Sequence, residues 1–332
     1  VIRVFEQRSQ ELQNLKGMEA ETLDGHTYKL LANVELIEEI PLLEQLGIPG
    51  IGLLRTELLF WEAREDLEGQ EAFYRDIATR LAPHPVTVRL FDLGGDKILQ
   101  TPLVETNPFL GVRGIRALLR APRLLKTQLR ALVRANDAGN LRIMIPMVTS
   151  VEEVQQVKTL LEEVAREEGR EVPPLGAMIE TPAAALMTEV LARHVSFFSI
   201  GTNDLTQYVL AMDRLNPFLQ NEFTALHPAV IRLLWFTVKR ARRAGVWLAV
   251  CGEMASDLIA LPLLVGLGVE ELSMSPSMYL EAKDLIRSIH REETQKLVEQ
   301  AMNATTSREI EDMARAFLRE RVAPNVRLSL GI

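Results

Sequence analysis

The chain lacks several features that would point to a membrane or a secreted protein. One cysteine among 332 residues cannot form an internal disulfide, so we expect the reducing cytoplasm as its compartment. No apolar run reaches the roughly 18 residues that a membrane-spanning helix needs, and residues 1–10 lack the apolar segment of a secretory signal. The chain does not begin with methionine, and we interpret it as a piece of a longer protein.

Positively charged residues are outnumbered by negatively charged ones, and the histidines are not arranged as a metal site or a phosphohistidine loop. A formal net charge of −8 disfavours a surface that neutralises a nucleic-acid backbone, so we expect neither nucleic-acid nor membrane binding. The five histidines have no metal-pair spacing, and none lies in a Gly-rich loop beside Ser or Thr. Candidate chemistry must therefore come from carboxylates, cations and the single thiol.

Short apolar runs alternate with amphipathic segments along most of the chain. Segments such as 151–168 carry apolar residues at i, i+3 and i+4, which predicts helices. Strands that alternate with helices pair in parallel, and eight such units predict a closed (β/α)₈ barrel. An open doubly wound sheet is the competing architecture, but its Gly-rich turn after the first strand is missing. The expected strands are LLANV, GIGLLR, VTVRLFD, RIMIPM, LGAMIE, FFSIG, VWLAV and ELSMS.

The two ends of the chain differ from this alternation. Residues 1–23 are polar with a thin apolar stripe, and we expect a linker helix there, followed by the barrel over residues 24–332. Residues 281–322 have a helical pattern that is interrupted at 303–307, where NATTS offers turn and N-cap residues. We therefore expect extra helices at the C-terminal end.

Polar side chains gather where the predicted strands end, which is where barrels of this kind carry their active sites. Five cations lie beside turn signals, and such a set suits a small polyanion, because the arginine fork binds phosphate or carboxylate with two hydrogen bonds. Any one of them could instead pair with a surface carboxylate. The five are Arg55, Arg89, Lys97, Arg113 and Arg214.

Two carboxylates and the cysteine complete the candidate site. Glu180 and Asp204 follow neighbouring predicted strands and could share one magnesium ion, although each motif is also a good helix start. Cys251 follows a third strand. It could be a small buried apolar residue, or a neutral thiol that gives a proton to a carbanion.

Six motifs in this order make the chain resemble the phosphoenolpyruvate-binding domain of Enzyme I of the bacterial phosphotransferase system. This domain belongs to the wider family of phosphoenolpyruvate-utilising enzymes. The resemblance covers residues 22–322 nearly throughout. The motifs are GIGLLRTELLF, VRLFDLGGDK, NPFLGVRGIR, MIETPAA, GTNDLTQYVLAMDRLNP and VCGEMASD.

The resemblance implies a magnesium-dependent transfer of the phosphoryl group of phosphoenolpyruvate to a histidine on another domain, with release of pyruvate. By motif, Glu180 and Asp204 would ligate Mg²⁺, and Cys251 would protonate the enolate carbon. Substrate binding would fall to Arg55, Arg89, Asn203 and Arg214, with Lys97 and Arg113 in support.

The resemblance also implies partners that this chain does not contain. The phosphohistidine domain should precede the barrel, and through it a histidine phosphocarrier protein would receive the phosphoryl group. A homodimer is implied too. The alternatives are a barrel of the pyruvate phosphate dikinase or phosphoenolpyruvate synthase type, a self-sufficient magnesium-dependent lyase or aldolase, or a non-catalytic module that senses phosphoenolpyruvate.

Overall fold

A single sheet lies at the centre of the molecule. The computed structural model describes residues 8, 10–100, 104–324, 326–327 and 331–332. Eight strands match the eight runs predicted from the sequence, and a short ninth strand precedes them. They are β1 (Ala20–Glu21), β2 (Thr27–Val34), β3 (Ile51–Leu54), β4 (Val86–Arg89), β5 (Leu141–Ile145), β6 (Leu175–Ile179), β7 (Phe197–Ile200), β8 (Trp247–Val250) and β9 (Glu271–Met274).

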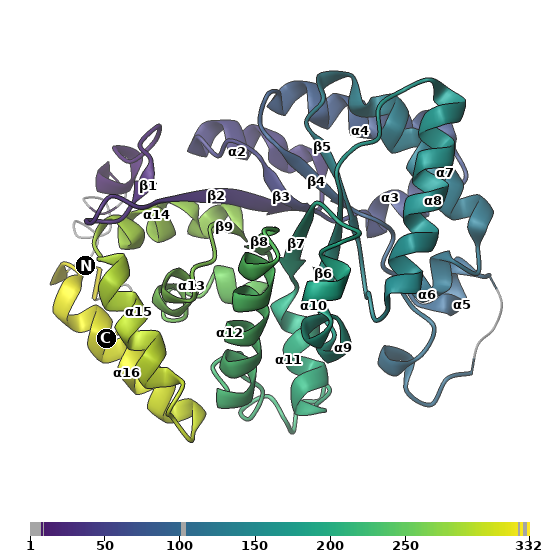
Figure 1. The fold of residues 1–332 in the computed structure, drawn as a ribbon. Helices are drawn as coiled ribbons and strands as arrows, with labels where there is room; N and C mark the ends of the chain where they lie inside the picture. Colours follow the sequence, from purple (N-terminus) through teal and green to yellow (C-terminus); the bar gives the residue numbers. More distant parts are fainter. Residues whose placement is uncertain (1–7, 9, 101–103, 325, 328–330) are drawn as a thin grey trace.

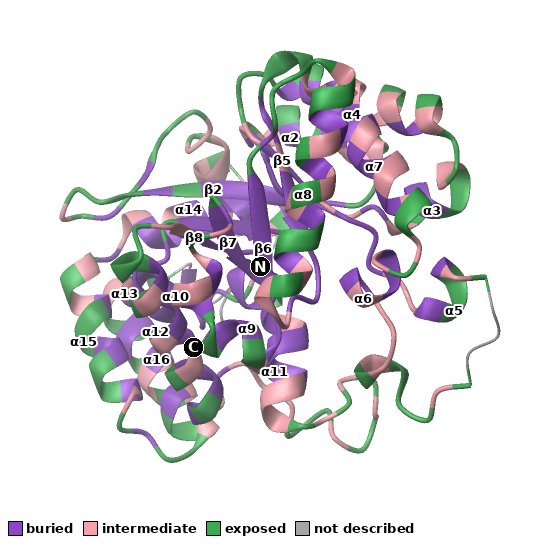
Figure 2. Ribbon diagram, turned by 45° about the vertical axis from the view of Figure 1, so that its right-hand side comes forward, coloured by how far each residue is buried: buried purple, intermediate pink, exposed green. Residues whose placement is uncertain are grey.

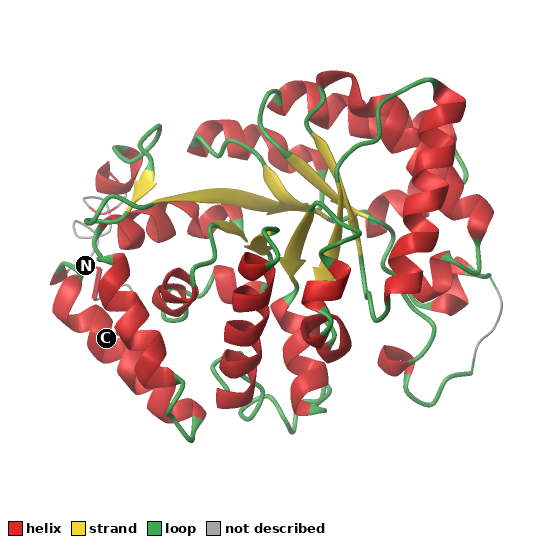
Figure 3. Ribbon diagram, viewed as in Figure 1, coloured by secondary structure: helices red, strands yellow, loops and turns green. Residues whose placement is uncertain are grey.

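The sheet closes on itself. From β2 to β9 each strand pairs in parallel with the next, and β2 also pairs with β9, with Lys29 opposite Glu271 and Ala32 opposite Met274. Figure 1 and Figure 3 show the strands inside a surrounding layer of helices. The predicted (β/α)₈ barrel is confirmed. Because all eight strands run the same way, their C-terminal ends meet at one mouth of the barrel and their N-terminal ends at the other.

Helices connect the strands as the periodicity predicts. The expected helix over 151–168 is confirmed as α8, which begins with a capping box in which Ser150 accepts a hydrogen bond from the Glu153 N–H. The helices along the barrel are α2 (Ile40–Leu46), α3 (Glu57–Ala63), α4 (Leu67–Leu81), α5 (Gly95–Ile98), α6 (Ile115–Leu118), α7 (Pro122–Ala135), α8 (Val151–Glu168), α9 (Pro182–Leu186), α10 (Thr188–Leu191), α11 (Thr202–Leu210), α12 (Pro228–Arg243) and α13 (Leu261–Leu267).

The N-terminal segment differs from the expected linker helix of residues 1–23. Residues 10–13 are helical, whereas residues 1–7 and 9 lie outside the described residues. Ala20 and Glu21 form β1, which pairs antiparallel with Tyr28 and Thr27 of β2. The helix expectation is therefore wrong for these two residues, because backbone pairing with β2 satisfies their hydrogen bonds.

The C-terminal helices are confirmed and are more divided than the sequence indicates. Besides the expected interruption near 303–307, a second one separates the first two helices at 288–290. The segment comprises α14 (Tyr279–Arg287), α15 (Arg291–Ala301) and α16 (Ser307–Arg321), which lie together beside α13 in Figure 1. Across the described residues, no helix combines the length and apolar character that crossing a bilayer requires.

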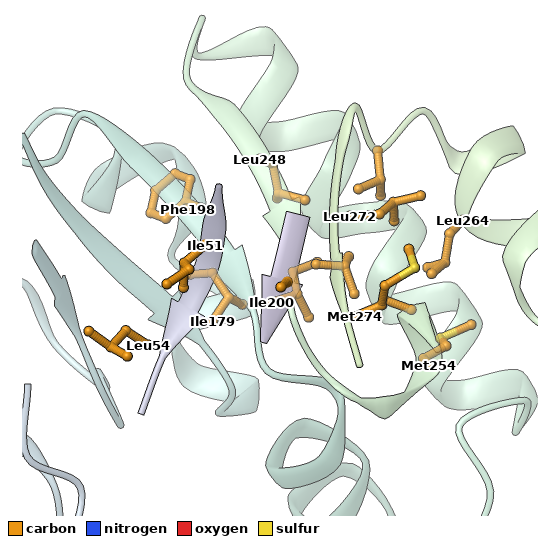
Figure 4. Close-up of a cluster of buried hydrophobic side chains, with 14 of the residues drawn as sticks. Ile51, Leu54, Ile179, Phe198, Ile200, Leu248, Met254, Leu264, Leu272 and Met274 are labelled. Carbon is orange, nitrogen blue, oxygen red and sulfur yellow. The ribbon is translucent and has the colours of Figure 1, made fainter. Parts of the chain in front are cut away.

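The core has two parts because strand side chains alternate between the faces of the sheet. The larger part lies between barrel and helices and includes Ile200 and Leu272 of the strands and Leu264 of α13 (Figure 4). Figure 2 shows the strands as buried almost throughout. The smaller part fills the barrel interior and consists of Leu53, Met144, Met178, Phe197 and Cys251. This apolar plug leaves the polar side chains at the two barrel mouths.

Candidate functional site

The C-terminal ends of the strands enclose a cavity of about 260 Å³. Eight of the nine side chains proposed from the sequence line it together, although they come from loops after several different strands. They are Arg55, Arg89, Arg113, Glu180, Asn203, Asp204, Arg214 and Cys251. The arrangement arises from the parallel barrel, which brings strand ends far apart in sequence to one mouth.

Lys97 is the predicted site residue that the structure does not bring into this cavity. It lies on the short helix α5 and lines a neighbouring cavity of about 420 Å³, which shares Asp92 and Arg113 with the first. The Lys97 Nζ lies 5.8 Å from the centroid of the Trp61 ring. In this structure Lys97 therefore contacts an aromatic ring beside the site rather than the site itself.

Ion pairs with buried carboxylates hold three guanidinium groups at the cavity wall. Asp92 Oδ2 lies 3.0 Å from Arg113 Nη2 and 3.4 Å from Arg89 Nη1. Arg113 Nη1 lies 3.1 Å from Asp204 Oδ1, and Arg214 Nη1 lies 3.5 Å from Asp204 Oδ2. Burial alone would lower the pKa of Arg89, but nearby carboxylates outweigh it and raise that pKa. These cations are charged and fixed before any ligand arrives.

Arg55 differs from the other three arginines. Within the described part of the chain, no carboxylate lies within 4.0 Å of its guanidinium, and its side chain has no hydrogen-bond partner there. It is partly buried and lines the same cavity. A cation without a partner keeps its donors free, so Arg55 can bind an anion without first breaking an ion pair.

Glu180 is fully surrounded by the barrel mouth. Its Oε1 accepts a hydrogen bond of 2.6 Å from the Met147 N–H, and Met147 has a φ of 55°. Burial, together with the charges of Asp92 and Asp204, raises the pKa of Glu180 to about 8. The charged form of this carboxyl group is therefore disfavoured unless a further cation lies beside it.

The donor set at Glu180 and Asp204 fits a magnesium ion chemically. Both side chains offer the hard oxygen ligands that Mg²⁺ prefers, and this ion is often held by one or two carboxylates with water and substrate oxygens. The cavity is lined by four guanidinium groups and five carboxyl groups, so a polyanion would be repelled without an added cation. In the described residues no group of three or more His, Cys, Asp or Glu forms a metal site by itself.

Helix α11 and the loop after β8 are joined by Asn203. Its Oδ1 accepts a hydrogen bond of 2.9 Å from the Glu253 N–H. The amide nitrogen of Asn203 has no acceptor among the described residues, and its side chain is half-buried. Asn203 therefore has a free donor at the cavity, beside the loop that carries Cys251.

Cys251 has features of both a buried structural cysteine and a proton donor, the two interpretations made from the sequence. Its side chain is 2% exposed and packs in the apolar interior cluster, as a structural cysteine would. It also lines the charged cavity. Burial raises the pKa of the thiol to about 11, so the sulfur holds its proton near neutral pH. The Asn33 amide donates a hydrogen bond of 2.9 Å to the Cys251 carbonyl and fixes this strand end.

Sequence reasoning missed two residues that shape the site. Glu57 Oε1 lies 2.6 Å from Arg89 Nη2 and orients that guanidinium. Gly114 has a φ of 52°, and a Cβ there would lie 2.9 Å from both Asp92 Oδ1 and the Met147 side chain. The sequence feature that could have revealed Glu57 is its position two residues after Arg55. The feature that could have revealed Gly114 is its position directly after Arg113.

Two curated relatives are similar over most of the chain. The multiphosphoryl transfer protein of Xanthomonas campestris pv. campestris is 46% identical over 301 residues, which cover 89% of this chain and 36% of that protein. The phosphoenolpyruvate-protein phosphotransferase of Staphylococcus carnosus is 40% identical over 324 residues, which cover 94% of this chain and 56% of that protein. The chain thus spans about a third to a half of the length of these relatives.

A solved structure shares the fold at low sequence identity. The ternary complex of malate synthase from Haloferax volcanii with pyruvate and acetyl-CoA superposes with a TM-score of 0.50 at 13% identity, covering 72% of this chain and 61% of that chain. This likeness concerns the barrel architecture alone. The sequence is more specific, since residues 9–291 match the family model described as "PEP-utilising enzyme, PEP-binding domain". With its barrel, its cation-lined mouth and its close relatives, the chain belongs to the family of phosphoenolpyruvate-binding domains of phosphoenolpyruvate-utilising enzymes.

Proposed function

We propose that this chain binds phosphoenolpyruvate at the C-terminal mouth of its barrel and, with magnesium, supplies the phosphoryl group to a histidine on a separate phosphohistidine domain. The observation that carries the proposal is Arg55, which has no carboxylate partner among the described residues, in a cavity whose other three guanidinium groups lie beside carboxylates. The activities for which the two relatives are named support the same reaction class.

Substrate binding follows from the cation arrangement. The phosphate and the carboxylate of phosphoenolpyruvate would be held by Arg55, Arg89 and Arg214, while Arg113 holds Asp92 and Asp204 in place. The free Asn203 amide would donate to a phosphate oxygen. Lys97 would join only if the loop with α5 moved toward the cavity, and its substrate contact stays a prediction.

The reaction needs one bond change at phosphorus and one at carbon. A histidine nitrogen of the partner domain attacks the phosphorus, the bond between phosphorus and the enol oxygen breaks, and the electron pair stays on the enolate. The enolate carbon then takes a proton and becomes the methyl group of pyruvate. The Cys251 thiol is neutral near pH 7, lines the cavity and is our proposed proton donor.

Magnesium would be held by Glu180 and Asp204, and when bound it supplies positive charge to the phosphate oxygens. Burial and the charges of Asp92 and Asp204 raise the pKa of Glu180, and a bound cation would oppose this by favouring the charged carboxylate. We place the reaction in the cytoplasm, with a histidine phosphocarrier protein downstream of the phosphohistidine domain. We also retain the homodimer as a proposal.

The decisive experiment supplies the missing acceptor. The chain is mixed with a separately produced phosphohistidine domain, phosphoenolpyruvate labelled at phosphorus, and either Mg²⁺ or a chelator. We expect label on the domain and one pyruvate per phosphohistidine with Mg²⁺, and neither product with chelator. Calorimetry of phosphoenolpyruvate binding, run in parallel, should show weaker binding without the metal.

Two outcomes of this experiment would contradict the proposal. Pyruvate formed by the chain alone would instead favour a self-sufficient lyase. The chain could also bind phosphoenolpyruvate tightly and transfer no label to the phosphohistidine domain. If that domain is competent, as shown by its phosphorylation within the full-length enzyme from which it was taken, this result would favour a sensing module. A phosphohistidine domain that carries alanine in place of its acceptor histidine is the matched control and should remain unlabelled.

A further inference from the structure

A second charged cavity lies at the opposite end of the barrel from the site described above. It has a volume of about 480 Å³. Its wall includes Lys29 near the start of β2, Arg142 near the start of β5, Trp247 at the start of β8 and Glu271 at the start of β9. Because all these strands are parallel, the cavity is at the N-terminal mouth, separated from the first one by the apolar interior cluster.

Trp247 and Arg142 in the wall of this cavity contact neighbouring side chains. Trp247 stacks on Phe197 with ring centroids 4.9 Å apart and an angle of 10° between the planes. The Arg142 guanidinium also lies over the Trp247 ring, 4.7 Å from its centroid. Arg142 Nη1 also lies 3.3 Å from Glu271, a buried side chain that is 3% exposed. Only Nη1 makes this contact, so the remaining N–H groups of Arg142 have no acceptor among the described residues.

Further cations stand at this mouth without partners. Over the described ranges, neither the Lys29 ammonium nor the guanidinium of the half-buried Arg291 has a carboxylate within 4.0 Å, while the Arg291 main-chain N–H donates a hydrogen bond of 2.8 Å to Asp24 Oδ1. The Arg291 Nε and the hydroxyl of Tyr28, which is 3% exposed, are buried there without a hydrogen-bond partner. A face that served stability alone would pair such groups, because each buried donor without a partner costs stability.

We propose that this N-terminal mouth is a second ligand site, for a small anion that carries a phosphate or a carboxylate group. The three cations outnumber the two carboxyl groups in the wall, Glu270 and Glu271, and Arg142 is already neutralised by the latter. Carboxylate and phosphate groups are the anions that the arginine fork binds with two parallel hydrogen bonds. The proposal does not depend on the reaction at the other mouth.

Tryptophan fluorescence tests the proposal directly. The chain has three tryptophans, and Trp61 and Trp235 are exposed, so the background variant Trp61→Phe/Trp235→Phe leaves Trp247 in the cavity wall as the reporter. Inorganic phosphate is titrated in one arm and succinate in a second, at constant ionic strength held with sodium chloride. We expect a saturable change with at least one of them, and the responding arm identifies the ligand group.

A charge-matched pair of variants decides whether the change comes from this cavity. In the same background, Lys29→Gln/Arg291→Gln removes two cations from the cavity wall, whereas Lys296→Gln/Arg308→Gln removes two exposed cations elsewhere. We expect about tenfold weaker binding in the first pair and no change in the second. Phosphoenolpyruvate binding at the other mouth, measured by calorimetry, should be unchanged in both.

Two results would overturn the second site. One is the absence of a saturable change with either anion. The other is an equal affinity in the two charge-matched variants, which would assign the change to general charge screening. If Lys29→Gln/Arg291→Gln unfolds, the single variant Lys29→Gln replaces it, because Lys29 is exposed. We then expect anion binding to be about threefold weaker. Unaltered binding would contradict the second site.

Discussion

At the scale of single residues, the site combines cations that are already paired with one that is free. Arg113 contacts both Asp92 and Asp204, so it supports the cavity wall, whereas Arg55 contacts no carboxylate in the described part of the chain. The two arginines have the same charge but different surroundings. Removing each of them should therefore have different consequences for stability.

We expect Arg55→Gln to leave the free energy of unfolding within about 0.5 kcal/mol of the parent value and to weaken phosphoenolpyruvate binding about tenfold or more. Arg113→Gln should also weaken binding, but it leaves two buried carboxylates with fewer partners and should cost about 1–3 kcal/mol of stability. Urea unfolding and calorimetry measure the two quantities. Equal losses of stability would show that Arg55 is not free in solution.

Cys251→Ala separates a proton donor from a packing residue. If the thiol donates the proton, phosphoenolpyruvate binding should persist, while pyruvate formation slows by about 10²–10⁴-fold. Phosphoryl transfer to a supplied phosphohistidine domain can continue, since the enolate leaves before it is protonated. If Cys251 only packs, the substitution should cost about 1 kcal/mol and leave both rates unchanged. Single-turnover measurement of phosphohistidine and pyruvate in one sample distinguishes the two cases.

At the scale of elements, the loop that carries Arg113 depends on a glycine. Gly114 and Gly139 both have positive φ, at 52° and 70°, but a Cβ at Gly139 would meet nothing within 4 Å. A Cβ at Gly114 would instead press on Asp92 and Met147. Substitutions at these two glycines therefore distinguish the effect of backbone strain alone from the effect of crowding Asp92 and Met147.

We expect Gly139→Ala to cost about 1–2 kcal/mol through backbone strain alone, with phosphoenolpyruvate binding intact. Gly114→Ala should cost a further 1–3 kcal/mol or so through overpacking and should weaken binding, because it displaces the Asp92 contact with Arg113. Thermal unfolding and calorimetry on both variants give the comparison. Unaltered binding in Gly114→Ala would mean that this loop adjusts without moving the cation.

Element positions were predictable where the pattern is local. The helix α8 follows from its apolar spacing and its Ser150 cap, and strand-end side chains such as Glu180 meet because parallel strands share a mouth. The strand β1 was missed because only its pairing with β2 defines it. The turn residues beside Lys97 predicted that this side chain lies in the site. The structure places it in the neighbouring cavity instead, because the direction of the loop that carries α5 is not determined by the local sequence pattern.

At the scale of the whole molecule, the proposed homodimer makes a simple prediction. Leu215 and Phe218, in the C-terminal half, are 67% and 90% exposed and offer apolar surface for a second copy. We expect a species of dimer mass in sedimentation at micromolar concentration. A monomer alone, both with and without phosphoenolpyruvate and Mg²⁺, would contradict the dimer.

The closure of the barrel between β2 and β9 also determines when the chain can fold. These two strands are about 240 residues apart in sequence, and each supplies the other with backbone partners. At roughly 5–20 residues per second a ribosome needs about 12–50 s to pass from one strand to the other. During that interval the nascent β2 has one open edge, so the barrel cannot close until β9 has been synthesised.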